Sequence, residues 1–170
     1  MADIKIPGPQ PVGSPLYLRD EELRQGVGLL FFASRAVAAE GANAVSGASL
    51  GPAHTRAIMI IARNPGLSVT DLQGYLKVAK QSLNRVLRTL FEDGLVEARV
   101  GKTDKRERRL HLTEKGAALE RSLSDAQRAR MRAAYRAAGP QSVQGFRMVL
   151  EAMMDPEMRR QYQGLKENNG

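Results

Sequence analysis

The chain of 170 residues contains no cysteine and no tryptophan, and it has only two histidines. Without cysteine it can form no disulfide, no thiolate metal site and no cysteine-based redox switch. Two separated histidines would need scattered carboxylates to bind zinc, so we expect no metal site. A secretory signal and a long apolar run are also missing, which predicts a cytoplasmic protein that does not enter the membrane.

Sequence motifs of enzymes are missing as well. The chain has no G-x-x-x-x-G-K-[ST] phosphate loop, no H-E-x-x-H pair and no nucleophile elbow, and no nucleophile stands at an informative spacing from a base. We therefore expect no enzymatic activity, no catalytic residues and no cofactor. The hydrophobic fraction of 42% is enough for one folded domain, with or without a helical extension.

Positive charge is concentrated in one part of the chain. There are 26 Lys and Arg against 18 Asp and Glu, a net charge of +8. Residues 79–109 hold nine of these cations and five of the anions, so they carry half of the net charge in less than a fifth of the length. A concentrated positive field suits a polyanionic partner such as a nucleic acid.

The pattern of residues 68–94 predicts two short helices joined by a tight turn. The second helix, over residues 80–93, has an apolar stripe made by Leu83, Val86, Leu87, Leu90 and Phe91. Gly94 suits a left-handed residue at its end. The opposite face carries groups that read base edges and bind phosphates in a major groove: Lys80, Gln81, Ser82, Asn84, Arg85 and Arg88. Taken alone, this face could equally be a solvated surface.

Two strand patterns follow, over residues 95–100 and 109–112, where apolar and polar residues alternate. The loop between them, residues 101–108, is too charged to be buried and predicts a hairpin wing that enters a minor groove. Asp104 fits such a loop if it pairs with Arg106 and fixes its direction. The expected DNA-binding residues of the wing are Lys102, Lys105, Arg106 and Arg108, with Asp104 as support.

Helix start signals lie on both sides of this unit. Ser68 and Asp71 form a variant of the capping box before the first helix, and Thr113 is expected to cap a helix that starts at Glu114. These signals place the ends of the helix-turn-helix and of the wing.

A further helix is expected over residues 52–63, with Pro52 at its first position. His54 and Arg56 lie in or near its first turn. The preferred interpretation is that both are ordinary helix-surface residues. The functional alternative is that both are phosphate contacts.

The remaining segments read as long amphipathic helices over about residues 20–42, 114–138 and 142–154, with a stop at Gly139-Pro140. Their apolar residues are too many for one small winged domain to cover, so we expect a homodimer. A proline-rich arm over residues 1–19 precedes them.

Taken together, these features make the sequence resemble the MarR family of winged helix-turn-helix transcriptional regulators. The resemblance covers about residues 20–155. Three features carry the resemblance. The helix-turn-helix and the strand after it contribute Leu72, Leu76, Val78, Leu83, Arg85, Leu90, Gly94, Leu95 and Val96. The wing contributes Asp104, Arg106, Arg108 and Arg109, and the segment that follows the wing contributes the sequence LTEKG at residues 112–116.

The resemblance implies a mainly α fold with a small β-hairpin wing, in which helices flank a winged helix-turn-helix. The winged DNA-binding domain would span residues 51–113, the dimerisation helices residues 20–50 and 114–155, and the C-terminal tail residues 156–170. It further implies a pseudo-palindromic double-stranded operator, with the recognition helix in the major groove and the wing in the minor groove. A small-molecule effector would bind where the dimer region meets the winged domain, but no residue set identifies the ligand.

Two positions depart from the family pattern. Lys77 stands at the turn position where the family usually has glycine, and Ala79 stands at the N-cap that is usually Ser or Thr. If Lys77 adopts a left-handed conformation, the cost is on the order of 1 kcal/mol.

Two other functions use similar features. A general basic protein that binds RNA or shapes nucleic acid would stack bases on exposed aromatic side chains. Phe91 is the only aromatic residue in 79–109, and its position on the apolar stripe argues against this reading. A winged-helix protein-interaction module is the other alternative, which the cation-rich wing disfavours.

Overall fold

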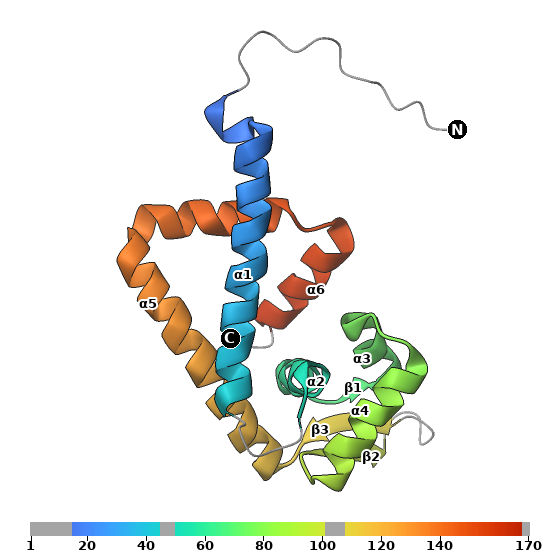
Figure 1. The fold of residues 1–170 in the computed structure, drawn as a ribbon. Coiled ribbons are helices and arrows are strands. Elements are labelled where there is room, and N and C mark those ends of the chain that lie inside the picture. The colour runs from blue at the N-terminus through green and yellow to red at the C-terminus, as the bar shows by residue number, and fades with distance from the viewer. Residues whose placement is uncertain (1–14, 45–49, 101–107, 168–170) are drawn as a thin grey trace, which may run out of the picture. The chain divides into compact units, whose positions relative to one another are not determined.

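The computed structural model describes residues 15–44, 50–100 and 108–167 (Figure 1). The chain separates into two units, Met1–Ala36 and Val37–Gly170, which we describe one at a time. The described part of the first unit contains a short 3-10 helix, η1 (Leu16–Leu18), and most of helix α1 (Asp20–Ala44). Asp20 is itself the first residue of α1, and its carboxylate pairs with Arg24 at 3.3 Å.

The second unit contains a compact winged portion followed by two more helices (Figure 1). In chain order its elements are α2 (Pro52–Arg63), β1 (Leu67–Ser68), α3 (Val69–Leu76), α4 (Lys80–Glu92), β2 (Val96–Val100), β3 (Arg108–Leu112), α5 (Glu114–Ala152) and α6 (Pro156–Glu167). The predicted fold, mainly α with a small wing, is confirmed.

The sheet has three antiparallel strands in the order β1-β3-β2, where the sequence predicted a two-stranded hairpin. Leu67 in β1 pairs with Leu110 in β3, and Val96 in β2 pairs with Leu112. The extra strand was missed because β1 is only two residues long and lies inside a turn signal. Pairing with β3 ties the segment before α3 to the base of the wing.

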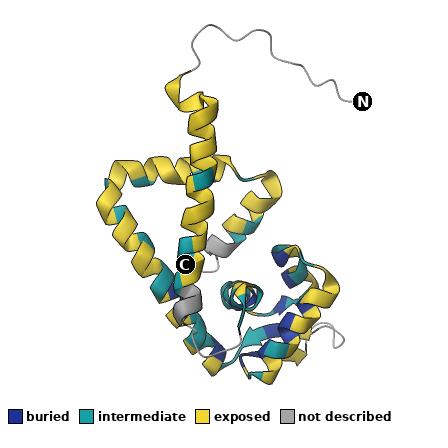
Figure 2. Cartoon of the chain, in the orientation of Figure 1, coloured by how far each residue is buried: buried dark blue, intermediate teal, exposed yellow. Residues whose placement is uncertain are grey.

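The hydrophobic core lies in the winged portion and reaches the start of α5 (Figure 2). Helix α2 contacts α3, α4, α5 and β3, and so forms its centre. The buried side chains are Ala57, Ile58, Ile61, Leu67, Leu72, Leu76, Leu83, Val86, Leu87, Leu90, Leu95, Val96, Leu110 and Leu123.

Local capping fixes the ends of the helices as predicted. The backbone N–H of Asp71 donates to Ser68 Oγ at 3.0 Å, and the N–H of Ser68 donates to Asp71 Oδ2 at 3.4 Å, which confirms the capping box. Gly94 is left-handed, with φ of 63°, and the N–H of Leu95 donates to the carbonyl of Leu90 at 2.9 Å. This is the hydrogen-bond pattern of a Schellman motif at the end of α4.

Helix α5 consists of two helical arms that are separated by a kink in its middle. Gly139 has φ of 79° and ψ of 165°, and Pro140 follows it directly. Proline removes a backbone donor and clashes with the preceding turn, so the regular helix is interrupted there. The predicted stop at Gly139-Pro140 is confirmed, because α5 consists of two helices that meet across this non-helical residue. The helix expected over residues 142–154 is the second arm of α5, and no loop precedes it.

Two predictions of burial are wrong. Phe91 was placed on the apolar stripe of the recognition helix, but its side chain is 40% exposed. The alternation over residues 95–100 is typical of a strand with one buried face, but Val100 at the end of this strand is 51% exposed. Phe91 lies at the edge of the buried face of α4, and along β2 burial decreases from Val96 to the exposed residues at the other end of the strand.

The helices outside the winged portion expose much of their apolar surface (Figure 2). Large exposed side chains on α1 are Leu23, Val27, Leu29, Leu30, Phe31 and Phe32, and those on the second arm of α5 are Phe146, Met148 and Val149. None of the helices that the structure describes is long and apolar enough to cross a membrane.

Candidate nucleic-acid interface

The turn between α3 and α4 holds the two helices of the motif in place. Lys77 does adopt the left-handed conformation, with φ of 50° and ψ of 44°. Its backbone N–H donates to the carbonyl of Gln73 at 2.9 Å, and the Gln73 side-chain amide donates to the carbonyl of Val78 at 3.3 Å. Gln73 therefore fastens both ends of the turn, a role that the sequence pattern did not reveal.

Helix α4 has one face in the core and the other in solvent. Leu83, Val86, Leu87 and Leu90 are buried. The six predicted contact residues, Lys80, Gln81, Ser82, Asn84, Arg85 and Arg88, are all exposed. Within the described part of the chain their side chains form no hydrogen bond and no ion pair, so their donors and acceptors are available to a ligand.

The first turn of α4 adds to this polar face. Ala79 is the N-cap and makes no side-chain hydrogen bond, which leaves the first N–H groups of the helix without a protein cap. The partial positive charge at a helix N-terminus adds to that of Lys80. This end of α4 is therefore attractive to anions.

Two cations at the base of the wing form hydrogen bonds with other groups of the protein. Arg99 donates from Nε and Nη2 to Glu97 Oε1 at 2.8 and 2.5 Å, and Arg109 Nη1 donates to the carbonyl of Gly66 at 3.1 Å. Arg108, at the start of β3, is exposed. The predicted wing residues Lys102, Asp104, Lys105 and Arg106 lie outside the described residues.

Helix α2 holds the two candidate phosphate contacts. The N–H of Gly51 donates to His54 Nδ1 at 3.0 Å, so the neutral ring carries its proton on Nε2. His54 is half-buried and serves as a cap for α2, whereas the sequence had suggested an ordinary surface residue. Arg56 is exposed, and its Nε donates to the carbonyl of Pro52 at 3.3 Å.

The start of α5 is fastened to the end of α4 by contacts that the sequence did not predict. Thr113 caps α5 as expected, because the N–H of Gly116 donates to its Oγ1 at 3.0 Å. The same hydroxyl donates to the carbonyl of Gly94 at 2.7 Å, and Lys115 Nζ donates to the carbonyl of Asp93 at 2.7 Å. These bonds orient the recognition helix relative to the wing and to α5.

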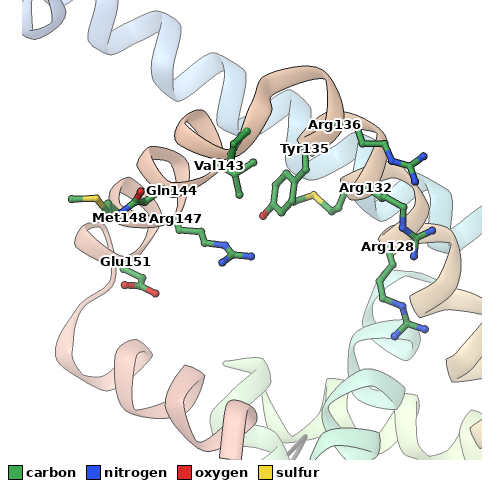
Figure 3. A pocket seen from close by; sticks show the side chains of 11 residues that line it. Arg128, Arg132, Tyr135, Arg136, Val143, Gln144, Arg147, Met148 and Glu151 are labelled. Atoms are coloured by element: carbon green, nitrogen blue, oxygen red, sulfur yellow. The ribbon is translucent and has the colours of Figure 1, made fainter.

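Two hollows in the second unit could hold a small molecule. A hollow of about 1020 Å³ lies along the two arms of α5, where Arg128, Arg132 and Arg136 follow the first arm and Arg147 extends from the second over the ring of Tyr135 (Figure 3). The smaller one, of about 290 Å³, lies where α2, the wing strands and α5 meet, and it is lined by Arg99, His111, Glu120 and Arg121 among others. Among the described residues no group of three His, Asp or Glu side chains could hold a metal ion.

Comparisons with known proteins point to one family. A sequence model of the MarR family matches residues 48–107. The HTH-type transcriptional regulator PetP of Rhodobacter capsulatus is 62% identical over 167 residues, which cover 98% of this chain and 99% of that protein.

Solved structures share the fold at lower identity. FabT of Streptococcus pneumoniae in complex with DNA has a TM-score of 0.66 at 18% identity and covers 85% of this chain and 97% of its own. A Mycobacterium tuberculosis MarR family protein in complex with p-aminosalicylic acid has a TM-score of 0.55 at 24% identity and covers 74% and 95%.

Proposed function

This chain belongs to the MarR family of transcriptional regulators, and we propose that it binds a pseudo-palindromic double-stranded operator as a homodimer. The observation that carries the proposal is the solvent face of α4, where six polar and basic side chains have no partner in the described chain while the opposite face is anchored in the core. A helix held in this way can be laid into a major groove without being distorted. Such a protein would act in the cytoplasm and would need no catalytic activity.

We assign the residues of the recognition helix to two roles. Gln81, Ser82, Asn84 and Arg85 would approach base edges, because amides and guanidinium groups form paired hydrogen bonds with adenine and guanine. Lys80 and Arg88 would hold phosphates, which position the protein but carry no sequence information. The exposure of all six side chains supports this assignment.

The wing and α2 would extend the contact. In the wing, Arg106, held by Asp104, would enter the minor groove, while Lys102, Lys105 and Arg108 would bind phosphates. His54 and Arg56 are candidate phosphate contacts on α2. The Nε2–H of His54 is left for such a contact because Nδ1 already accepts from Gly51.

We propose that residues 51–113 form the DNA-binding domain and that residues 20–50 and 114–155 carry the dimer interface. Residues 1–19 would be an arm, and residues 156–170, which include α6, a C-terminal tail. The exposed apolar side chains of α1 and of the second arm of α5 support an interface there, because monomeric proteins rarely leave large contiguous apolar patches in water.

We propose that an organic anion modulates DNA binding from the hollow of about 290 Å³ at the junction of the wing and α5. Arg121 is exposed and has no partner in the described chain, and His111 also lines the hollow. The family member that holds p-aminosalicylic acid supports this ligand class. Titration with p-aminosalicylate should lower the affinity for DNA, and Arg121→Ala should weaken that response. An unchanged affinity would exclude this compound as an effector.

The function is tested by selecting bound duplexes from a random DNA pool. A palindromic product is expected. Single-stranded RNA added as a competitor should not displace the selected duplex, and displacement would indicate RNA binding instead. Arg85→Ala should then lower affinity for the selected duplex far more than for random duplex. Lys102→Ala should weaken both about equally and reduce the slope of log affinity against log salt by about 0.9 for each phosphate that the protein no longer neutralises. If the two variants behave alike, α4 does not read sequence.

A further inference from the structure

The turn residue Lys77 carries backbone strain that a glycine at the same position would not have. It is the only residue other than glycine with a positive φ in the part of the chain that the structure describes, at 50°. The left-handed conformation brings Cβ too close to the following carbonyl oxygen in every L-residue, whereas glycine adopts it freely. The turn thus requires the backbone conformation, but it does not require a lysine.

Nothing within the described chain offsets that strain through the side chain. Lys77 is exposed, and its ammonium group forms no hydrogen bond or ion pair there. The turn itself is held by backbone and amide bonds, from the Lys77 N–H to Gln73 and from the Gln73 side chain to Val78. Any residue with a left-handed backbone could take the same place.

The position of Lys77 suggests what the side chain does. It stands three residues before Lys80, at the entry to the recognition helix. When the N-terminal part of such a helix enters a major groove, the preceding helix crosses the sugar-phosphate backbone, so the turn between them lies next to phosphates. A flexible lysine is a point charge suited to phosphate, and it has no fork with which to read a base edge.

We propose that Lys77 binds a DNA phosphate beside the entry to the recognition helix, and that this contact offsets the strain of its left-handed backbone. The inference rests on the proposed function. It makes Lys77 a positioning residue for DNA binding. Strained backbone persists where it serves a function, and here the function belongs to the side chain.

One substitution should then have opposite effects on stability and on affinity. Lys77→Gly removes the strain and the charge together. The DNA-free protein should melt about 2–4 °C higher, the shift expected for a modest stabilisation of a chain of this size. Its affinity should nevertheless fall several-fold for selected and random duplexes alike, with the salt slope smaller by about 0.9 for each copy of Lys77 in the complex. A merely structural residue would move stability and affinity in the same direction.

Two further variants separate charge from backbone. Lys77→Asn keeps a side chain that tolerates the left-handed conformation but removes the charge, so it should reduce the salt slope by the same amount. Lys77→Arg keeps the charge and should retain the slope without gaining stability. Melting curves without DNA and duplex titrations at several salt concentrations measure both properties.

The outcomes distinguish this inference from the proposed function. If the wild-type chain binds duplex DNA but Lys77→Gly and Lys77→Asn keep its affinity and slope, the role of Lys77 is overturned and the function stands. If Lys77→Gly lowers the melting temperature, the strain argument is overturned. If the wild-type chain does not bind duplex DNA, both fail together.

Discussion

The winged portion and the helices outside it use apolar residues in opposite ways, and Figure 2 shows that buried residues gather in the winged portion while the other helices are mostly exposed. In α4, Leu83 is completely buried, whereas Phe32 in α1 is 68% exposed and Val149 in α5 is 59% exposed. The winged portion closes its core within one chain. The apolar surface of the flanking helices stays in water until something else covers it.

The difference follows from how the apolar residues are arranged along each helix. In α4 they occupy one face, so a single contact with the core covers them. In α1 the run Leu29-Leu30-Phe31-Phe32 spreads over more than one face, which one neighbouring surface cannot cover. Folding of one chain is therefore enough to bury the apolar residues of the winged portion, whereas association with a second chain would bury those of the flanking helices.

The largest expected effect concerns the exposed apolar surface of the flanking helices. Phe32→Glu should dissociate the proposed dimer, because a two-fold interface carries the change twice and each copy forfeits about 1.5–3 kcal/mol of burial. The dissociation constant should rise by a factor on the order of 100 or more. Sedimentation should change from twice the 18.6 kDa chain mass to that of one chain. Phe32→Leu, which stays apolar, should remain dimeric, and a dimeric Phe32→Glu would exclude α1 from the interface.

A cavity in the core of the winged portion should lower the stability of the fold without affecting association. Leu83→Ala removes a completely buried side chain, so the free energy of unfolding should fall by about 2–5 kcal/mol. Urea denaturation at several protein concentrations measures it. The matched change Val149→Ala, on an exposed residue, should give a smaller decrease that shrinks on dilution, because it acts through association, which stabilises less as the wild-type dimer dissociates. Equal behaviour of the two variants would remove the contrast between the regions.

A tight backbone contact provides the next test. A Cβ on Gly116 would lie 2.0 Å from the carbonyl oxygen of Leu95, and backbone cannot yield as a side chain can. Gly116→Ala should therefore lower the free energy of unfolding by about 1–3 kcal/mol or more. Gly74→Ala is the control in α3, where a Cβ meets nothing within 4 Å, and it should stabilise by up to about 1 kcal/mol. Thermal melting that ranks them the other way would contradict this packing.

The smallest effect concerns the link between α4 and α5. Thr113→Ala removes a cap and the hydrogen bond to Gly94, at a cost of about 0.5–2 kcal/mol. Thr113→Ser keeps the hydroxyl and should restore most of the stability in chemical denaturation. If serine does not restore it, the methyl group rather than the hydroxyl stabilises this junction.

Sequence alone predicted the features whose cause lies within a few residues. The capping box of Ser68 with Asp71, the Thr113 cap of α5 and the left-handed Gly94 depend on bonds and sterics that span at most one helical turn. The apolar stripe of α4 was also readable, because a period of 3.6 residues shows which side faces a core. These local signals were enough for the motif and for the list of candidate DNA contacts.

Tertiary structure decided the features that join distant parts of the chain. The pairing of Leu67 with Leu110, the bond from Arg109 to Gly66 and the bond from Lys115 to Asp93 connect segments 22 to 43 residues apart. No local pattern encodes such partners, because each depends on which surfaces meet when α2, the sheet and α5 pack. Phe91 shows the same limit: periodicity placed it on the edge of the buried face, but only the extent of the packed core determined that its ring remains in solvent.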